Sequence, residues 1–319
     1  MQIKHEIKNI LCVRNDRFGE FLLNIPALRA LKETFPAAKI TMVVDPYVAE
    51  LAQAVPFISE IIEWPNVKHD ILEKFKFIKL LKSRSIDMAV MLNSSKELNI
   101  ITHFAGIPIR VGYDRKFSFL LTHKIKDLKH LGEKHEVDYN LELAGLVGAA
   151  TKDKAITLNI DNDIASNLFA GYSIKADDFL VALHPWTSDH LKQWPQARFS
   201  ELINKLSAVD NLKIIIVGST KFKYPQNNKI LNLTSKTNLQ QLAGVLKKCK
   251  VLISCDSGPM HLAACVGTPV VALFRNDIQG KTAKRWGPWG QGHMVIEKNS
   301  LLDITVDEVY AKVMEVVNK

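Results

Sequence analysis

The sequence predicts an α/β protein of two domains, each built on a parallel β-sheet that is covered by helices. Three observations lead to this prediction. The chain has 319 residues, which is about twice the usual size of one domain. Short apolar runs alternate with segments whose apolar residues recur at helical spacing. This alternation weakens near residues 160–176 and then starts again, so we expect domains at 1–165 and 166–319, with a cleft between them.

The first half begins with a buried strand over residues 9–14 (NILCVR), followed by a helix over residues 20–35. A second strand is expected at residues 39–44, a charged helix at 69–84 and a further strand at 87–92. Strands that alternate with helices in this way are typical of parallel sheets, because parallel neighbours need a crossover connection.

The second half repeats this pattern and ends with two apolar strands separated by a short helix. Ligands of open parallel sheets gather beyond the carboxyl ends of the strands, so we look for the site there. The expected strands cover 179–184, 212–218, 250–255 and 269–274, and the expected helices cover 196–206 and 260–266.

The net charge of +9, from 42 Lys and Arg against 33 Asp and Glu, favours anionic partners or indicates a solvated basic surface. No nucleic-acid-binding module is recognisable, so we expect no nucleic-acid partner. The four cysteines form no CxxC pair, and the sequence has neither a signal peptide nor a run of about 18 apolar residues. We therefore expect a cytoplasmic protein with reduced thiols.

Several chemical classes lack their motifs. The absence of GxGxxG, the phosphate-binding P-loop, HExxH and GxSxG speaks against dinucleotide oxidoreductases, P-loop ATPases, zinc proteases and serine hydrolases. We expect neither a metal site nor a cofactor.

The first expected strand ends in a junction that contains Asp16, Gly19 and Glu20. A carboxylate in the first turn of a helix is favoured in its ionised form and is suited to act as a base. Alternatively, Asp16 is an N-cap and Glu20 is an ordinary acidic residue at a helix start.

The strand at 179–184 leads into a loop with Thr187, Ser188 and Lys192. Two hydroxyls and an ammonium group are suited to bind a diphosphate. Alternatively, this is an ordinary polar loop that Trp194 anchors in the core.

The strand at 250–255 leads into a third junction, in which Asp256, Ser257 and Gly258 precede a short helix. The amino end of that helix is expected to bind an anion. His261 lies in its first turn, where it is either a ligand-binding or a structural residue.

Together these segments resemble the heptosyltransferase family of bacterial lipopolysaccharide glycosyltransferases, which have the GT-B fold of two Rossmann-like domains facing a central cleft. The resemblance is carried by VRNDRFGEFLLNIPALRALKETFPAAKI, HPWTSDHLKQWP, CDSGPMHLAACVGTPVVALF and RWGPWGQGHMVI, in the order and spacing of the family.

The resemblance implies an inverting, metal-independent transfer of heptose from ADP-heptose to the inner core of lipopolysaccharide. It places Glu20 as the catalytic base, where the family usually has Asp, and Lys192 beside the departing diphosphate. An acidic residue that the family often has near Ser219 is missing, and Arg275, Asn276 and Asp277 replace a glycine-containing turn. The implied donor-binding residues are Thr187, Ser188, Lys192, Asp256, Ser257, Gly258, Pro259, Met260 and His261.

The implied acceptor is a lipid-linked core oligosaccharide, bound by the first domain at the inner face of the inner membrane. The basic stretch from Arg110 to His130 is expected to contact this acceptor or the anionic inner leaflet, or else to form a solvated basic face beside a buried Phe–Leu cluster. Two other functions remain open, namely a nucleotide-sugar epimerase or hydrolase and a catalytically silent nucleotide-sugar-binding protein. The expected acceptor-binding residues are Asp16, Arg115, Lys116 and Lys124.

Overall fold

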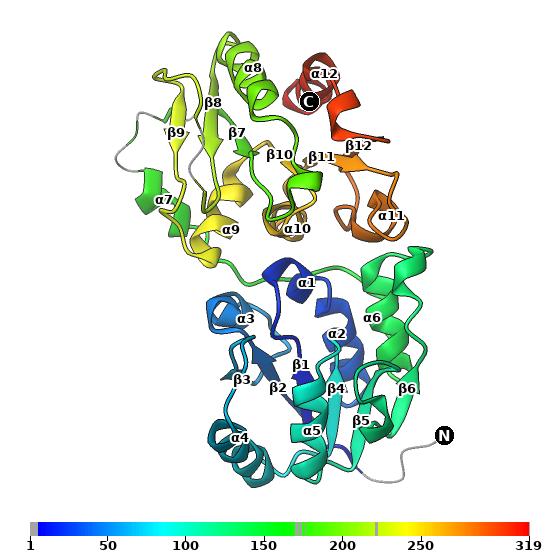
Figure 1. Cartoon of the computed structure of the whole chain (residues 1–319). Coiled ribbons are helices and arrows are strands. Elements are labelled where there is room, and N and C mark those ends of the chain that lie inside the picture. The colour runs from blue at the N-terminus through cyan, green and yellow to red at the C-terminus, as the bar shows by residue number, and fades with distance from the viewer. Residues whose placement is uncertain (1–5, 170–171, 173, 176, 221–222, 319) are drawn as a thin grey trace. The chain divides into compact units, whose positions relative to one another are not determined.

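The computed structural model describes residues 6–169, 172, 174–175, 177–220 and 223–318. The chain forms two compact units (Figure 1). The first comprises the chain up to His130 together with Lys134–Thr157, and the second comprises Leu131–Glu133 and the chain from Leu158 onward. The change of unit lies just before the region where the sequence pattern weakens, of which residues 170, 171, 173 and 176 are outside the described residues.

Each unit contains a six-stranded sheet in which all paired strands are parallel. The spatial orders are β3-β2-β1-β4-β5-β6 and β12-β11-β10-β7-β8-β9. If strands are counted from the start of each unit, both sheets have the order 3-2-1-4-5-6 of a Rossmann fold. The strands are β1 (Asn9–Val13), β2 (Lys39–Val44), β3 (Glu60–Glu63), β4 (Met88–Met91), β5 (Ile109–Tyr113), β6 (His123–Ile125), β7 (Phe179–His184), β8 (Leu212–Ile216), β9 (Ile230–Asn232), β10 (Val251–Cys255), β11 (Val270–Arg275) and β12 (Met294–Lys298).

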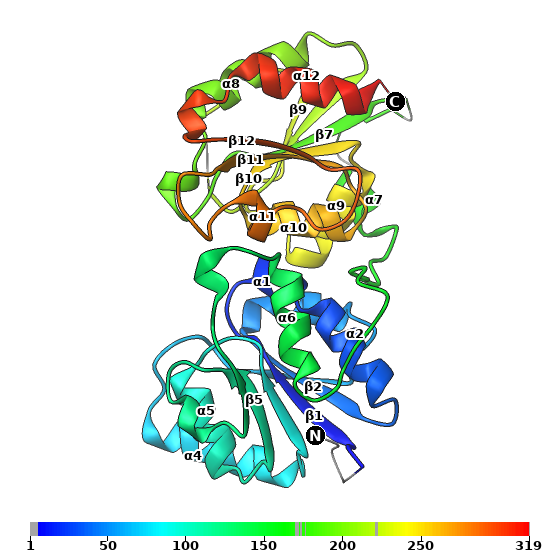
Figure 2. The same cartoon turned by 90° about the vertical axis from the view of Figure 1, so that its right-hand side faces the viewer.

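In the first unit, helices cover both faces of the sheet. Phe77 of α4 and Ile101 of α5 pack on one face against Leu11 and Met91, and α2 lies beside α6 on the other face (Figure 2). Successive strand residues point to opposite faces, so a sheet covered on both sides needs strands that are apolar throughout. The helices are α1 (Phe18–Leu22), α2 (Ile25–Thr34), α3 (Ala49–Gln53), α4 (Ile71–Ser83), α5 (Lys96–Phe104) and α6 (Glu136–Gly145).

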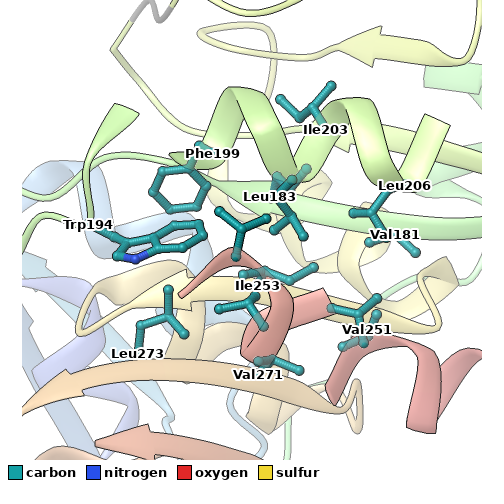
Figure 3. Packing of buried hydrophobic residues seen from close by; sticks show 14 of the residues in the cluster. Val181, Leu183, Trp194, Phe199, Ile203, Leu206, Val251, Ile253, Val271 and Leu273 are labelled. Carbon is teal, nitrogen blue, oxygen red and sulfur yellow. The ribbon is translucent and has the colours of Figure 1, made fainter. Parts of the chain in front are cut away.

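In the second unit, α8 and α12 share one face of the sheet and bury a single apolar cluster (Figure 3). Phe199 and Ile203 of α8 meet Leu183 of β7 and Ile253 of β10 there, and Trp194 closes the end of the cluster. The helices are α7 (Ile164–Phe169), α8 (Gln196–Ser207), α9 (Leu239–Lys248), α10 (Gly258–Cys265), α11 (Ala283–Trp286) and α12 (Val306–Val317).

The single helix expected over residues 20–35 is wrong, because the chain breaks into α1 and α2 at Leu23 and Asn24. Pro26 explains the break, since its ring would clash with the carbonyl of Leu22 in a continuous helix. The side-chain amide of Asn24 donates to the Glu20 carbonyl at 2.5 Å, which satisfies a group that the break exposes.

Candidate active site

In the second unit, an ion pair joins the two expected phosphate-binding junctions. The Lys192 ammonium contacts the Asp256 carboxylate, and both side chains are largely buried. Lys192 follows β7 and Asp256 follows β10, which are neighbouring strands at the centre of the sheet. Chain connections leave these two strands in opposite directions, so the pair lies at the topological switch point where α/β sheets bind ligands.

The loop after β7 is anchored by Trp194 and partly satisfied by its own hydrogen bonds. The indole Nε1 of Trp194 donates to the Ile304 carbonyl at 3.0 Å, so the expected anchor in the core is present. Thr187 is buried, and its hydroxyl donates to the Asp189 carbonyl at 2.7 Å. Ser188 is exposed. Only the Ser188 hydroxyl is therefore open to solvent, because the Thr187 proton is engaged within the loop.

Helix α10 begins after β10 with a serine that does not cap it. Ser257 has extended N-cap geometry, yet its side chain accepts no hydrogen bond from the helix. Its hydroxyl instead lies 2.8 Å from Ser254 Oγ and 3.1 Å from His184 Nδ1. Because the Ser257 hydroxyl contacts Ser254 and His184 instead, it does not cap the first backbone N–H groups of α10. A helix start that binds an anion needs such uncapped N–H groups.

His184 is a site residue that the sequence analysis did not identify. It ends β7, is buried, and contacts the hydroxyls of Ser254 and Ser257 through Nδ1. Burial lowers the pKa of His184 to about 4, so the imidazole is neutral at physiological pH. Gly218 has a positive φ of 131°, and a Cβ there would lie 3.0 Å from the His184 ring, so both the backbone conformation and the close ring favour glycine. The only feature of the sequence that could have indicated His184 is a polar residue at the end of an apolar strand.

The remaining residues of the third junction are mostly interior. Pro259, Met260 and His261 belong to the first turn of α10 and are all buried, with Met260 fully inaccessible. The Met260 side chain is thus part of the packed interior and presents no surface to solvent. The expected donor contacts of these three residues stay predictions.

A basic turn after β11 reaches the same loop. The Arg275 guanidinium donates to the Leu191 carbonyl at 3.1 Å and forms an ion pair with Asp277. Lys281 lies 3.9 Å from the Asp189 carboxylate. The departure from the family pattern at residues 275–277 therefore places one guanidinium group, itself paired with Asp277, against the Lys192 loop. Of the other departing segment, Lys221 and Phe222 lie outside the described residues.

In the first unit, the corresponding switch point holds the other expected chemical groups. Arg14 follows β1, donates to the Leu92 carbonyl after β4 at 2.9 Å, and pairs with Asp16 at 2.7 Å. Arg17, not Asp16, occupies the N-cap of α1, so Asp16 is not a helix cap. Glu20 lies in the first turn of α1, with 21% of its side chain exposed.

Burial raises the pKa of Glu20 above its usual value, and repulsion from Asp16 adds to this rise while Arg14 opposes it. The expectation that the helix start favours the ionised form is wrong for this residue. The largest cause of the raised pKa is burial, which disfavours the ionised form of the carboxylate. A raised pKa strengthens a carboxylate as a proton acceptor, provided that the carboxyl is ionised at the working pH.

The basic stretch of the first unit is extensively paired. Arg115 contacts Asp127 at 3.0 Å, and Lys124 contacts Asp114 at 3.1 Å. Lys129 is buried and paired with Glu136, so it is not part of a surface. Lys116 is exposed, has a positive φ of 39°, and accepts a hydrogen bond from Asn99 through its carbonyl. The acceptor-binding roles stay predictions.

The alternative of a buried Phe–Leu cluster in this stretch is wrong for its two phenylalanines, which are open to solvent. Phe119 is 74% exposed and Phe117 is 37% exposed, with ring centroids 5.3 Å apart.

Within the described ranges, no three His, Cys, Asp or Glu side chains form a group suited to hold a metal ion. No helix among the described residues is long and apolar enough to cross a bilayer.

A family model described as glycosyltransferase family 9 (heptosyltransferase) matches residues 74–306, which is more than half of the chain. The chain belongs to glycosyltransferase family 9. It is therefore a glycosyltransferase. The Lys192–Asp256 ion pair and the Glu20 carboxylate are candidate site groups of this enzyme.

Individual relatives agree with this assignment. Lipopolysaccharide heptosyltransferase 2 of Salmonella typhimurium is 25% identical over 288 residues, which cover 83% of this chain and 82% of the relative. The structure of E. coli ADP-heptose LPS heptosyltransferase II has a TM-score of 0.84 at 22% identity and covers 97% of this chain and 98% of its own. The structure of E. coli heptosyltransferase WaaC with ADP has a TM-score of 0.73 at 20% identity, and the match covers 96% of this chain and 99% of WaaC. The family 9 chain thus has the GT-B fold.

Proposed function

We propose that this family 9 chain transfers a heptose from ADP-heptose to the inner core of lipopolysaccharide, with inversion at the anomeric carbon and without a metal ion. The observation that carries the proposal is the Lys192–Asp256 ion pair, which joins two phosphate-binding junctions at the central switch point of the second unit. The nucleotide is assigned by analogy with E. coli heptosyltransferase WaaC, whose structure was solved with ADP.

The second unit is proposed to bind the donor and to stabilise the departing diphosphate. Lys192 supplies a positive charge, and Asp256 holds its ammonium group in place until the donor phosphates bind. The uncapped start of α10 supplies backbone N–H groups for the same phosphates. Preorganised donors of this kind contribute about 3 kcal/mol each to the lowering of a barrier, which is the work that a metal ion would otherwise do.

The first unit is proposed to bind the acceptor and to supply the base. Glu20 takes the proton of the acceptor hydroxyl while that oxygen attacks the anomeric carbon from the face opposite the diphosphate. The bond between carbon and diphosphate oxygen breaks in the same step, and ADP leaves. Asp16 is proposed to contact the acceptor, held in place by Arg14. One displacement of this kind inverts the configuration.

The acceptor is proposed to be a lipid-linked core oligosaccharide, reached by a cytoplasmic enzyme at the inner face of the inner membrane. The exposed cations Arg115, Lys116 and Lys124 support contact with its phosphates. Two alternatives predict different products, because an epimerase or hydrolase would convert the donor alone and a silent binding protein would convert nothing.

The purified chain should be incubated with ADP-heptose and a heptose-deficient lipopolysaccharide core, with and without a chelator. We expect mass spectrometry to detect one added heptose, and nuclear magnetic resonance to show the anomeric configuration opposite to that of the donor. The chelator should leave the rate unchanged. Retained configuration, a rate restored only by added Mg²⁺, or conversion of the donor without acceptor would each contradict the proposal.

A further inference from the structure

Helix α4 (Ile71–Ser83) belongs to the first unit (Figure 1). Several of its apolar side chains are exposed to solvent. Ile71 is 87% exposed, Leu72 60% and Phe75 66%, and Val67 just before the helix is 65% exposed. These four are among the most exposed large apolar residues of the described chain, and they fall within nine consecutive positions. Scattered exposed apolar residues are normal, but a contiguous group indicates a surface that is covered by a partner.

The opposite face of α4 holds the helix on the sheet. Phe77 and Leu81 are buried in the apolar cluster of the first unit, and Lys74 pairs with Glu97 of α5 at 2.9 Å. Asp70 and Glu73 form a capping box at the helix start. The outward direction of Ile71 and Phe75 is therefore fixed by a well-anchored helix, since residues four positions apart share a face.

Lysines lie on the same outward face as these apolar residues. Lys76 lies four positions after Leu72, Lys79 lies four positions after Phe75, and both are exposed. Lys68 and Lys82 are exposed at the two ends. In the part of the chain that the structure describes, no carboxylate forms an ion pair with Lys76 or Lys79. By contrast, the basic stretch discussed above has its Arg115 and Lys124 paired with acids.

Apolar side chains next to lysines are suited to the boundary between lipid headgroups and acyl chains. The aromatic and aliphatic side chains enter the acyl region, and the lysine stems extend their ammonium groups to anionic headgroups. A protein partner would need a complementary acidic and apolar surface, and a second copy of α4 would bring lysines against lysines. Charge complementarity therefore selects an anionic bilayer over self-association.

We infer that the outward face of α4, formed by Val67, Lys68, Ile71, Leu72, Phe75, Lys76, Lys79 and Lys82, docks the enzyme on an anionic lipid surface. This inference deepens the proposed function, on which it rests for the presence of a membrane-borne acceptor, and it places membrane contact on a different element from the basic stretch. The binding itself needs neither donor nor catalysis.

Co-sedimentation of the full chain with vesicles of phosphatidylglycerol and phosphatidylcholine tests the inference. We expect binding to these vesicles, weaker binding in high salt, and little binding to phosphatidylcholine alone. The double variant Leu72→Ser/Phe75→Ser should weaken binding by about tenfold or more, because it removes the inserted apolar groups. Lys76→Gln/Lys79→Gln should weaken it by about tenfold and reduce its dependence on salt.

The matched control is Leu302→Ser/Lys248→Gln, which changes one exposed apolar residue and one exposed lysine of the second unit. It should bind vesicles as the unaltered chain does, and Glu20→Gln should also do so, which separates docking from catalysis. Thermal unfolding checks that each variant is folded. Equal binding by the α4 variants and the control, equal binding to neutral vesicles, or a dimer in ultracentrifugation that the α4 changes dissociate would overturn the inference.

Discussion

At the scale of single residues, the two proposed catalytic side chains are both largely buried but have different charged neighbours. Glu20 is a largely buried carboxylate whose burial raises its pKa. Lys192 is held by the carboxylate of Asp256, which keeps the ammonium charge in place before the donor binds. A base with a raised pKa is suited to take the proton of the attacking hydroxyl, and a fixed cation is suited to stabilise the diphosphate anion that leaves the anomeric carbon.

Glu20→Gln should lower the turnover number by about 10²-fold or more while leaving the donor KM nearly unchanged, because only the proton acceptor is lost. In the unaltered enzyme, kcat/KM should rise with pH through a pKa above the ordinary value for Glu. Steady-state rates over a range of pH measure both effects.

A second measurement separates catalysis from damage to the fold. A carboxyl with a raised folded-state pKa contributes stability that is present below its unfolded pKa and is lost as pH rises through its folded pKa. Glu20→Gln should therefore be at least as stable as the unaltered chain at neutral pH. Full activity of this variant would remove Glu20 from the mechanism.

At the scale of elements, the loop that carries Lys192 depends on one large anchor. The Trp194 ring is fully buried, meets Phe199 edge to face with centroids 4.8 Å apart, and donates to the Ile304 carbonyl. Its backbone N–H lies 3.4 Å from Cys255 Sγ, at the end of the strand that precedes Asp256. The same residue therefore ties the loop after β7 to the junction after β10 and to the core.

Trp194→Ala should lower the free energy of unfolding by about 3–5 kcal/mol, because it leaves a large cavity in the cluster shown in Figure 3. Trp194→Phe keeps part of the packing and loses the hydrogen bond, so its cost should be smaller, with about 1 kcal/mol from the bond. Urea denaturation measures both. Donor KM should rise more for Ala than for Phe, and equal stability of the two variants would show that Trp194 is not the anchor.

At the scale of the whole molecule, the chain uses one sheet topology twice and places different chemistry at each central switch point. The first unit has Arg14, Asp16 and Glu20 there, and the second has Lys192 and Asp256. The proposed division into acceptor and donor binding follows from this difference, because a carboxylate base suits a sugar hydroxyl and a cation suits a diphosphate.

ADP should stabilise the second unit alone against heat. At about 100 times its Kd, a ligand adds about 2.7 kcal/mol, which corresponds to a rise in Tm of about 5 °C or more for a unit of this size. Calorimetry should show only the transition of the second unit moving. Lys192→Ala should diminish the shift, whereas Lys248→Ala, an exposed lysine of α9, should not. An equal shift for both variants would contradict the role of Lys192.

Much of the secondary structure could be predicted, because buried parallel strands are recognisable from local sequence. The expected strand at residues 179–184 coincides with β7, and the helix expected at 196–206 closely matches α8. The strands β3 and β6, with four and three residues, are too short for a periodic pattern. The helix expected at 20–35 was broken by Pro26, whose effect the apolar spacing concealed.

The sequence by itself determined the α/β class, the two repeated halves, the family resemblance and the residue types at each junction, because all of these depend on local order along the chain. Only the tertiary structure decided that Lys192 meets Asp256, 64 positions away. It also decided that the Ser257 hydroxyl contacts His184 instead of capping α10, and that burial raises the pKa of Glu20. These features depend on strand order and desolvation, which arise only when distant segments pack together.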